Sequence, residues 1–174
     1  SIVPRPIQQP HPPLHQVVDS PSSIEWAAKN RINTIMWIPT VQSLKKRFEI
    51  YKNARSEVEK RNVEMGEGVS LVRDMFIADS MEEAKEKAGE NMVNYMRWVC
   101  HWRGLGTHMN PGEELPKTEN KLDLLTYDFL HKRNMLFGTV DYVIEKIEEL
   151  QTELNLQNLQ VWSNFPGVKH EDCM

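Results

Sequence analysis

Three hydroxyl side chains follow an acid in the run Asp19-Ser20-Pro21-Ser22-Ser23. Ser20 suits the N-cap of a helix and Pro21 its first turn, while Ser22 and Glu25 match the S-x-x-E capping box. The first N–H groups of a helix lack carbonyl partners and attract anions. The run therefore predicts either a phosphate-binding loop or an ordinary capped helix, and its spacing alone leaves both open.

Alternating strand and helix patterns surround this run. Such alternation predicts an α/β fold with a parallel sheet and right-handed crossovers. A proline-rich, extended lead-in covers residues 1–13, and the glycines and prolines of residues 103–121 predict a long loop, either a functional lid or an insertion. Strands are expected at 14–18, 32–38, 69–78 and 159–162, and helices at 20–29, 40–60, 80–102, 122–131 and 139–154.

Five segments, in order along nearly the whole chain, carry a resemblance to a known family. The segments are 10–14 (PHPPL), 19–28 (DSPSSIEWAA), 72–84 (VRDMFIADSMEEA), 137–144 (FGTVDYVI) and 164–171 (NFPGVKHE). They resemble the bacterial luciferase family of flavin-dependent monooxygenases. The most specific is Asp19–Ala28, which is similar to the family's phosphate loop after its fifth strand. In the segment 137–144, Val140 stands where the family usually has proline.

The resemblance implies a (β/α)8 TIM barrel, of which residues 1–174 would form the carboxyl-terminal half, strands five to eight, with an insertion loop. The first half of the barrel has no counterpart here. A half barrel alone would leave two strand edges and one apolar face exposed. We therefore expect further chain or a tight homo- or hetero-oligomer.

The resemblance also implies the chemistry, which is the use of reduced FMN and molecular oxygen to oxidise a small organic substrate. Ser20 and Ser23 would donate hydrogen bonds to the FMN phosphate, and Asp19 or its backbone would shape the loop. Trp37, at the end of the next strand, would approach the flavin ring, or it is simply a core aromatic. The sequence assigns no catalytic residue.

A flavin reductase that supplies reduced FMN is the partner this chemistry implies. Two alternatives stay open. One is a deazaflavin-dependent oxidoreductase of the same family, which transfers hydride without oxygen. The other is a non-catalytic flavin-binding or half-barrel interaction subunit.

Composition and charge argue against several other classes of protein. A net charge of -4 without a basic cluster argues against nucleic acid as a partner, and no apolar run reaches membrane-spanning length. Two cysteines make no disulfide framework, which favours the cytoplasm. The six histidines lack metal-ligand spacing, so no metal is expected. Arg73 is expected to pair with Asp74 or Glu67.

Overall fold

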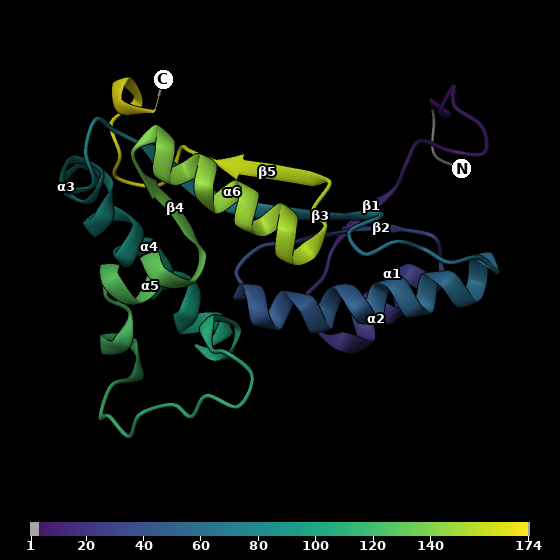
Figure 1. The fold of residues 1–174 in the computed structure, drawn as a ribbon, viewed down its shortest axis with the longest axis horizontal. Coiled ribbons are helices and arrows are strands. Elements are labelled where there is room, and N and C mark those ends of the chain that lie inside the picture. Colours follow the sequence, from purple (N-terminus) through teal and green to yellow (C-terminus); the bar gives the residue numbers. More distant parts are fainter. Residues whose placement is uncertain (1–3, 174) are drawn as a thin grey trace.

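The computed structural model describes residues 4–173 and shows one parallel sheet with helices packed against it (Figure 1). Residues 1–3 of the predicted lead-in, and Met174, lie outside the described residues, while residues 4–13 form an extended arm. The strands are β1 (His15–Val17), β2 (Asn33–Met36), β3 (Val69–Ile77), β4 (Met135–Gly138) and β5 (Asn158–Trp162). The helices are α1 (Pro21–Lys29), α2 (Val41–Glu59), α3 (Met81–Ala84), a π-turn (Lys85–Gly89), α4 (Glu90–Arg103), α5 (Tyr127–Asn134) and α6 (Val140–Leu154), with 3₁₀ turns at Gly106–His108, Lys121–Leu124 and His170–Asp172.

β3 is the central strand and has neighbours on both edges. Ser70 pairs with residues of both β2 and β5, so these two strands lie on opposite edges of β3. Asp74 pairs with residues of both β4 and β5, so β4 continues the edge that β2 occupies. The sheet therefore runs β1-β2-β3-β5 in chain order, and β4 is a short addition toward the carboxyl end of β3.

The four predicted strands are confirmed as β1, β2, β3 and β5, but the sequence prediction lacks β4. All four residues of β4 are buried. A strand buried on both faces shows no alternation of apolar and polar residues, so its periodicity carries no signal. β4 is also short and directly follows a helix, so the sequence gives little sign of where it begins.

One hydrophobic core lies between the sheet and three helices, α1, α2 and α6. Val69 and Leu71 of β3 point into it, and one face of α2 supplies Leu44, Phe48 and Tyr51, each at most 1% exposed. Burying several such side chains at about 1.5–3 kcal/mol each makes this the main attachment of the helices to the sheet.

A second core gathers at the carboxyl end of β3, where α4 and α5 pack. Phe76 of β3 and Phe137 of β4 lie 6.0 Å apart, and Phe165 stacks on Phe137 at 5.5 Å. Met92 and Met96 of α4 complete this core. β4 thus supports the aromatic packing above the sheet.

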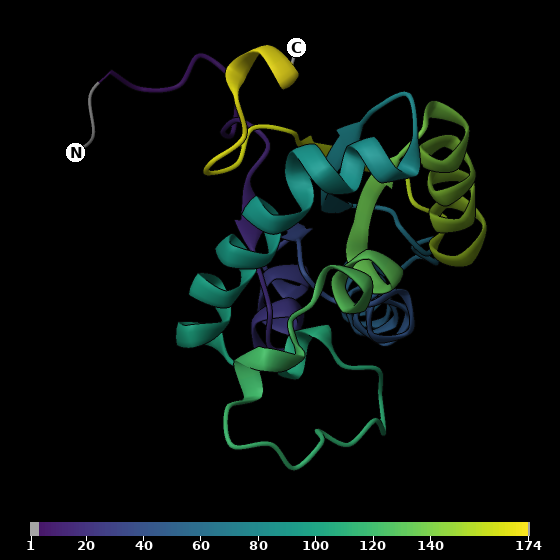
Figure 2. The same ribbon diagram turned by 90° about the vertical axis from the view of Figure 1, so that its left-hand side faces the viewer.

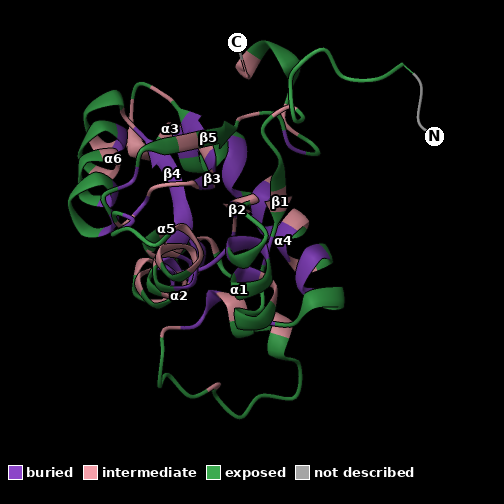
Figure 3. Cartoon of the chain, turned by 90° about the vertical axis from the view of Figure 1, so that its right-hand side faces the viewer, coloured by how far each residue is buried: buried purple, intermediate pink, exposed green. Residues whose placement is uncertain are grey.

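The opposite face of the sheet is only partly covered. Alternation and register place Val17, Ile35, Val72 and Gln160 on this inner face. Val17 is 63% exposed, and in Figure 3 much of β1 and β5 is coloured exposed. The predicted exposed edges and face are therefore present in the described chain.

The predicted start of the first helix is confirmed, because Ser20 caps α1 by accepting the Ser23 N–H and Pro21 opens the helix. The predicted Ser22/Glu25 capping box is wrong. Both of those residues lie inside α1, where Glu25 instead pairs with Lys29 at 2.6 Å. The helix expected at 122–131 begins at Tyr127, because Thr126 provides its cap.

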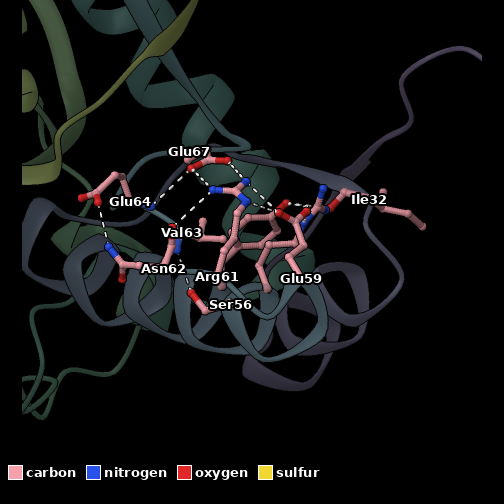
Figure 4. Close-up of polar contacts among 10 residues, drawn as sticks. Ile32, Ser56, Glu59, Arg61, Asn62, Val63, Glu64 and Glu67 are labelled. Atoms are coloured by element: carbon pink, nitrogen blue, oxygen red, sulfur yellow. Dashed lines mark hydrogen bonds and ion pairs between the residues drawn. The ribbon is translucent and has the colours of Figure 1, made fainter.

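The turn between α2 and β3 is fixed by charged side chains at the end of the sheet remote from the helix starts (Figure 4). Arg61 pairs with both Glu59 and Glu67. The Val63 N–H donates to Ser56 Oγ at 3.0 Å, and Asn62 Nδ2 donates to Glu64 Oε1 at 2.7 Å. This network sets where β3 begins.

Gly66→Ala is expected to lower the free energy of unfolding by about 2 kcal/mol. Gly66 has a φ of 83°, and a Cβ there would overlap the backbone carbonyl of Asn155. Gly112 has the same φ but no atoms within 4 Å of a Cβ, so Gly112→Ala is the matched control for backbone strain alone. Urea unfolding measures both, and equal losses in the two variants would contradict the predicted overlap.

Candidate flavin site

The residues predicted to bind cofactor come together at one edge of the sheet. Asp19, Ser20 and Ser23 follow β1, and Trp37 follows β2, which pairs with β1 in parallel. The carboxyl ends of neighbouring parallel strands meet at the same edge, which is where α/β barrels hold their sites. The fold therefore supports the predicted grouping, while the role of each residue stays a prediction.

The serine hydroxyls form a compact group at the start of α1. Ser20 Oγ lies 3.1 Å from both Ser22 Oγ and Ser23 Oγ, and Ser23 Oγ donates to the Ser20 carbonyl at 2.8 Å. The Ser22 N–H is among those for which a helix start supplies no carbonyl. An anion at this point would meet hydroxyls, an N–H group and the positive end of the helix dipole.

Arg47 of α2 also reaches this helix start, and the sequence analysis missed it. Its Nη1 donates to the Asp19 carbonyl and, at 2.9 Å, to Asp19 Oδ1. The guanidinium therefore fixes the loop and balances the Asp19 carboxylate, which would otherwise repel a phosphate. A planar guanidinium also has further N–H groups for a phosphate. Asp19 and Arg47 are 28 residues apart, so only a predicted α1–α2 contact could have revealed the pair.

Trp37 belongs to an aromatic cluster rather than standing alone. Its ring centroid lies 5.4 Å from that of Trp162, the last residue of β5, and 6.1 Å from that of Tyr95 on α4. Tyr95 and Trp162 meet edge to face at 5.6 Å. We call Trp37, Tyr95 and Trp162 the aromatic cluster; only Trp37 was singled out from the sequence.

A buried carboxylate lies against this cluster. Asp74 is 2% exposed, and its Oδ2 accepts the Trp37 indole N–H at 3.2 Å. Burial raises the pKa of Asp74 to about 6, against the opposing effects of the Trp37 hydrogen bond and the Arg73 charge. A carboxyl that titrates near neutral pH, in a cluster at a sheet edge, is a candidate for function.

Comparisons with known proteins identify the fold. No family model matches the chain. It is 27% identical over 149 residues to the oxygenase component of a flavin-dependent trigonelline monooxygenase from Acinetobacter baylyi, a match that covers 83% of this chain and 40% of that protein.

Solved structures of monooxygenases are similar to the chain in fold. The oxygenating constituent of 3,6-diketocamphane monooxygenase from Pseudomonas putida, in complex with FMN, matches with a TM-score of 0.65 and 19% identity, over 87% of this chain and 42% of that one. A monooxygenase from Streptomyces bottropensis matches with a TM-score of 0.69 and 18% identity, over 98% and 46%. The chain has the luciferase-like fold. The predicted family resemblance and TIM-barrel class are thereby confirmed.

The chain spans less than half the length of these relatives. A coenzyme F420-dependent tetrahydromethanopterin reductase from Methanopyrus kandleri shares the fold, with a TM-score of 0.58 and 14% identity, over 86% of this chain and 44% of that one. The fold therefore accommodates both flavin and deazaflavin enzymes.

The predicted pairing of Arg73 with Asp74 or Glu67 is wrong. Arg73 donates to the carbonyls of Trp37 and, at 2.7 Å, Pro39, while Glu67 is bound by Arg61. Adjacent strand residues point to opposite faces, so Arg73 and Asp74 face away from each other. Arg73 therefore satisfies carbonyls after β2 rather than neutralising Asp74.

The long loop at 103–121 extends away from the sheet (Figure 2) and is anchored near its beginning to the end of α5. His108 is fully buried, and its Nδ1 lies 3.1 Å from Asn134 Nδ2, which also donates to the Ile38 carbonyl at 2.8 Å. Burial, helped by the charges of Arg133 and Arg73, lowers the pKa of His108 to about 4. The sequence analysis considered His108 only as one of six histidines without metal-ligand spacing.

Within residues 4–173, no three His, Cys, Asp or Glu side chains converge as metal ligands. Over that same range, no helix has both the length and the apolar character needed to cross a bilayer.

Proposed function

We propose that this chain is the carboxyl-terminal half, strands five to eight, of an FMN-dependent monooxygenase that oxidises a small organic substrate. The observation that carries the proposal is the group of serine hydroxyls at the start of α1, with Arg47 bound to the adjacent Asp19, at the same edge of the sheet as Trp37. The resemblance to an oxygenase component of a flavin-dependent monooxygenase supports the same function.

The residues present fit the phosphate end of FMN. Ser20, Ser22 and Ser23 carry short hydroxyl groups that would rotate away from their present partners to donate to a phosphate, and Arg47 carries a positive charge nearby. Trp37, which follows the neighbouring strand β2, would contact the flavin ring. Reduced FMN would supply the reaction with molecular oxygen, and the protein would orient it and exclude water.

The proposal includes a partner. An oxygenase component needs reduced flavin from a reductase, so a separate flavin reductase is the expected partner, and the cytoplasm the expected compartment. The exposed inner face of the sheet supports closure by the other half of the barrel, or by another subunit.

Loss of phosphate recognition is the expected result of Ser20→Ala/Ser23→Ala in the full-length protein. The wild type should bind FMN more tightly than riboflavin, which lacks the phosphate. The double variant should lose about 10–100-fold of that preference, since hydrogen bonds to charged groups contribute about 1.5–3 kcal/mol. Flavin fluorescence titration with each ligand measures the preference.

Two further variants separate phosphate binding from helix capping. Ser20→Asp keeps an N-cap but places a negative charge at the phosphate, so it should bind FMN as poorly as the double variant. Ser80→Ala removes the cap of α3, where Ser80 Oγ accepts the Glu83 N–H, and should leave FMN binding unchanged. Equal affinities for FMN and riboflavin in the wild type would contradict the proposal.

A deazaflavin-dependent oxidoreductase is the second candidate, favoured by the F420-dependent structure that shares the fold. A phosphate site at α1 serves either cofactor. Competition between FMN and F420 for the purified protein, followed by their different absorbance, distinguishes the two functions.

A further inference from the structure

Asp74 carries a buried oxygen that the proposed flavin site does not use. Its Oδ2 accepts the Trp37 indole N–H, whereas Oδ1 has no hydrogen-bond partner among the described residues. Arg73 is turned to the other face, and no Lys, Arg or His of the described chain forms an ion pair with Asp74. An ionised carboxylate in such a place is costly unless a cation or donor meets it.

Aromatic rings surround this carboxylate. Trp162 is the register partner of Asp74, so its ring lies on the same inner face, and Tyr95 contacts both tryptophans. Trp and Tyr ring faces attract organic cations, most strongly where water is excluded. Aromatic faces together with an unpartnered carboxylate form the combination that recognises an organic cation.

We propose that Asp74 and the aromatic cluster bind the positively charged group of an organic cation, the substrate class of this enzyme. The proposal rests on the proposed function, because it makes that cation the small molecule to be oxidised. Asp74 would supply the opposite charge, and Trp37, Tyr95 and Trp162 would cover the apolar part of the cation.

The aromatic cluster borders an open groove. Trp162 is 37% exposed, and Tyr95 lines an open, mainly apolar groove between α4 and the turn after β5. The proposal requires Tyr95 or Trp162 to turn aside, so that a cation in this groove reaches the buried Asp74 Oδ1. The groove is lined by Asn91, Asn94, Tyr95, Trp98, Pro166 and Gly167.

A purely structural acid explains these observations less well. Buried aspartates are normally paired with a cation or fully hydrogen-bonded. Asp74 Oδ2 accepts one indole N–H, and burial leaves its carboxyl with a raised pKa. An asparagine could accept the same indole N–H without a buried charge, so the structure alone does not require a carboxylate here.

The test compares two probes of nearly equal shape, choline and its uncharged isostere 3,3-dimethyl-1-butanol. Calorimetric titration of the full-length protein should show at least about tenfold tighter binding of choline, the scale of a desolvated cation–π and charge contact. Asp74→Asn should weaken choline binding about tenfold and leave the alcohol within about twofold. Trp162→Leu should also weaken choline binding.

Asp79→Asn is the matched control, since it makes the same change at an exposed acid just after β3 and should leave both affinities unchanged. Equal affinities of the wild type for choline and the alcohol would overturn the inference, as would equal losses for both probes in Asp74→Asn. Unchanged choline binding in Asp74→Asn would overturn it as well.

FMN and riboflavin titrations on the same preparations keep the two proposals separable. An FMN preference without a choline preference would overturn the cation site and leave the flavin function standing. A choline preference without an FMN preference would overturn the flavin function. Loss of FMN binding in Asp74→Asn would overturn the cation role, because it would assign Asp74 to the flavin.

Discussion

As the pH rises from 4 to 8, the free energy of unfolding of Asp74→Asn is expected to rise by about 2.5 kcal/mol relative to that of the wild type. Burial raises the pKa of Asp74 to about 6 in the folded protein, above its value of 3.8 in the unfolded chain. The folded state therefore holds this proton more tightly, and the stability it contributes is lost as the pH rises through 6. Asparagine has no proton to lose, so the variant avoids that loss.

Urea unfolding of both proteins at several pH values measures the difference. Any packing cost of the substitution is nearly constant with pH and cancels in the comparison. Asp79→Asn, at the exposed position after β3, should follow the wild type. If the free energies of unfolding of Asp74→Asn and the wild type differed by a constant amount from pH 4 to pH 8, folding would not raise the pKa of Asp74.

His108→Asn should show the opposite dependence, with a relative gain of about 3 kcal/mol as the pH falls from 8 to 4. Burial lowers the pKa of His108 to about 4, below its value of 6.5 in the unfolded chain. The unfolded chain therefore binds the proton more tightly, and the folded protein loses stability as the pH falls below 6.5. Asparagine Oδ1 can replace Nδ1 as the acceptor for the Asn134 amide.

His101→Asn is the control for this prediction, because His101 is exposed on α4 and is not buried by folding. The same pH series measures it, with the unfolding of the 103–121 loop followed by hydrogen exchange. An unchanged pH dependence in His108→Asn would mean that the His108 ring is hydrated. In the wild type, Asp74 and His108 change the stability with pH in opposite directions, so their contributions partly cancel. The single variants measure each contribution separately.

Signals within a few residues of each other made much of the fold predictable. Thr40, Ser80 and Thr139 each accept an N–H three residues ahead, which a sequence displays directly. The buried face of α2 is equally predictable, because its apolar residues recur at helical spacing along one segment. The Ser22/Glu25 capping box failed because Ser20, two residues earlier, offered the same chemistry and took the cap.

Contacts between distant residues were not predictable in this way. Arg47 reaches Asp19 only because α2 packs against α1, and Trp37 meets Asp74 only because β2 and β3 are neighbours. Trp162 joins them through the register of β5 on β3. The resemblance is enough to propose the serines, whereas the residues of the proposed cation site required knowledge of the sheet register.

The central place of β3 has a consequence for synthesis on the ribosome. The strand that covers the second edge of β3 is β5, and it is made more than 80 residues after β3. A nascent chain therefore carries β3 with one bare edge for several seconds, at about 5–20 residues per second. Until Trp162 has emerged, Asp74 stays hydrated at no electrostatic cost, and the strained carboxylate is among the last features to form.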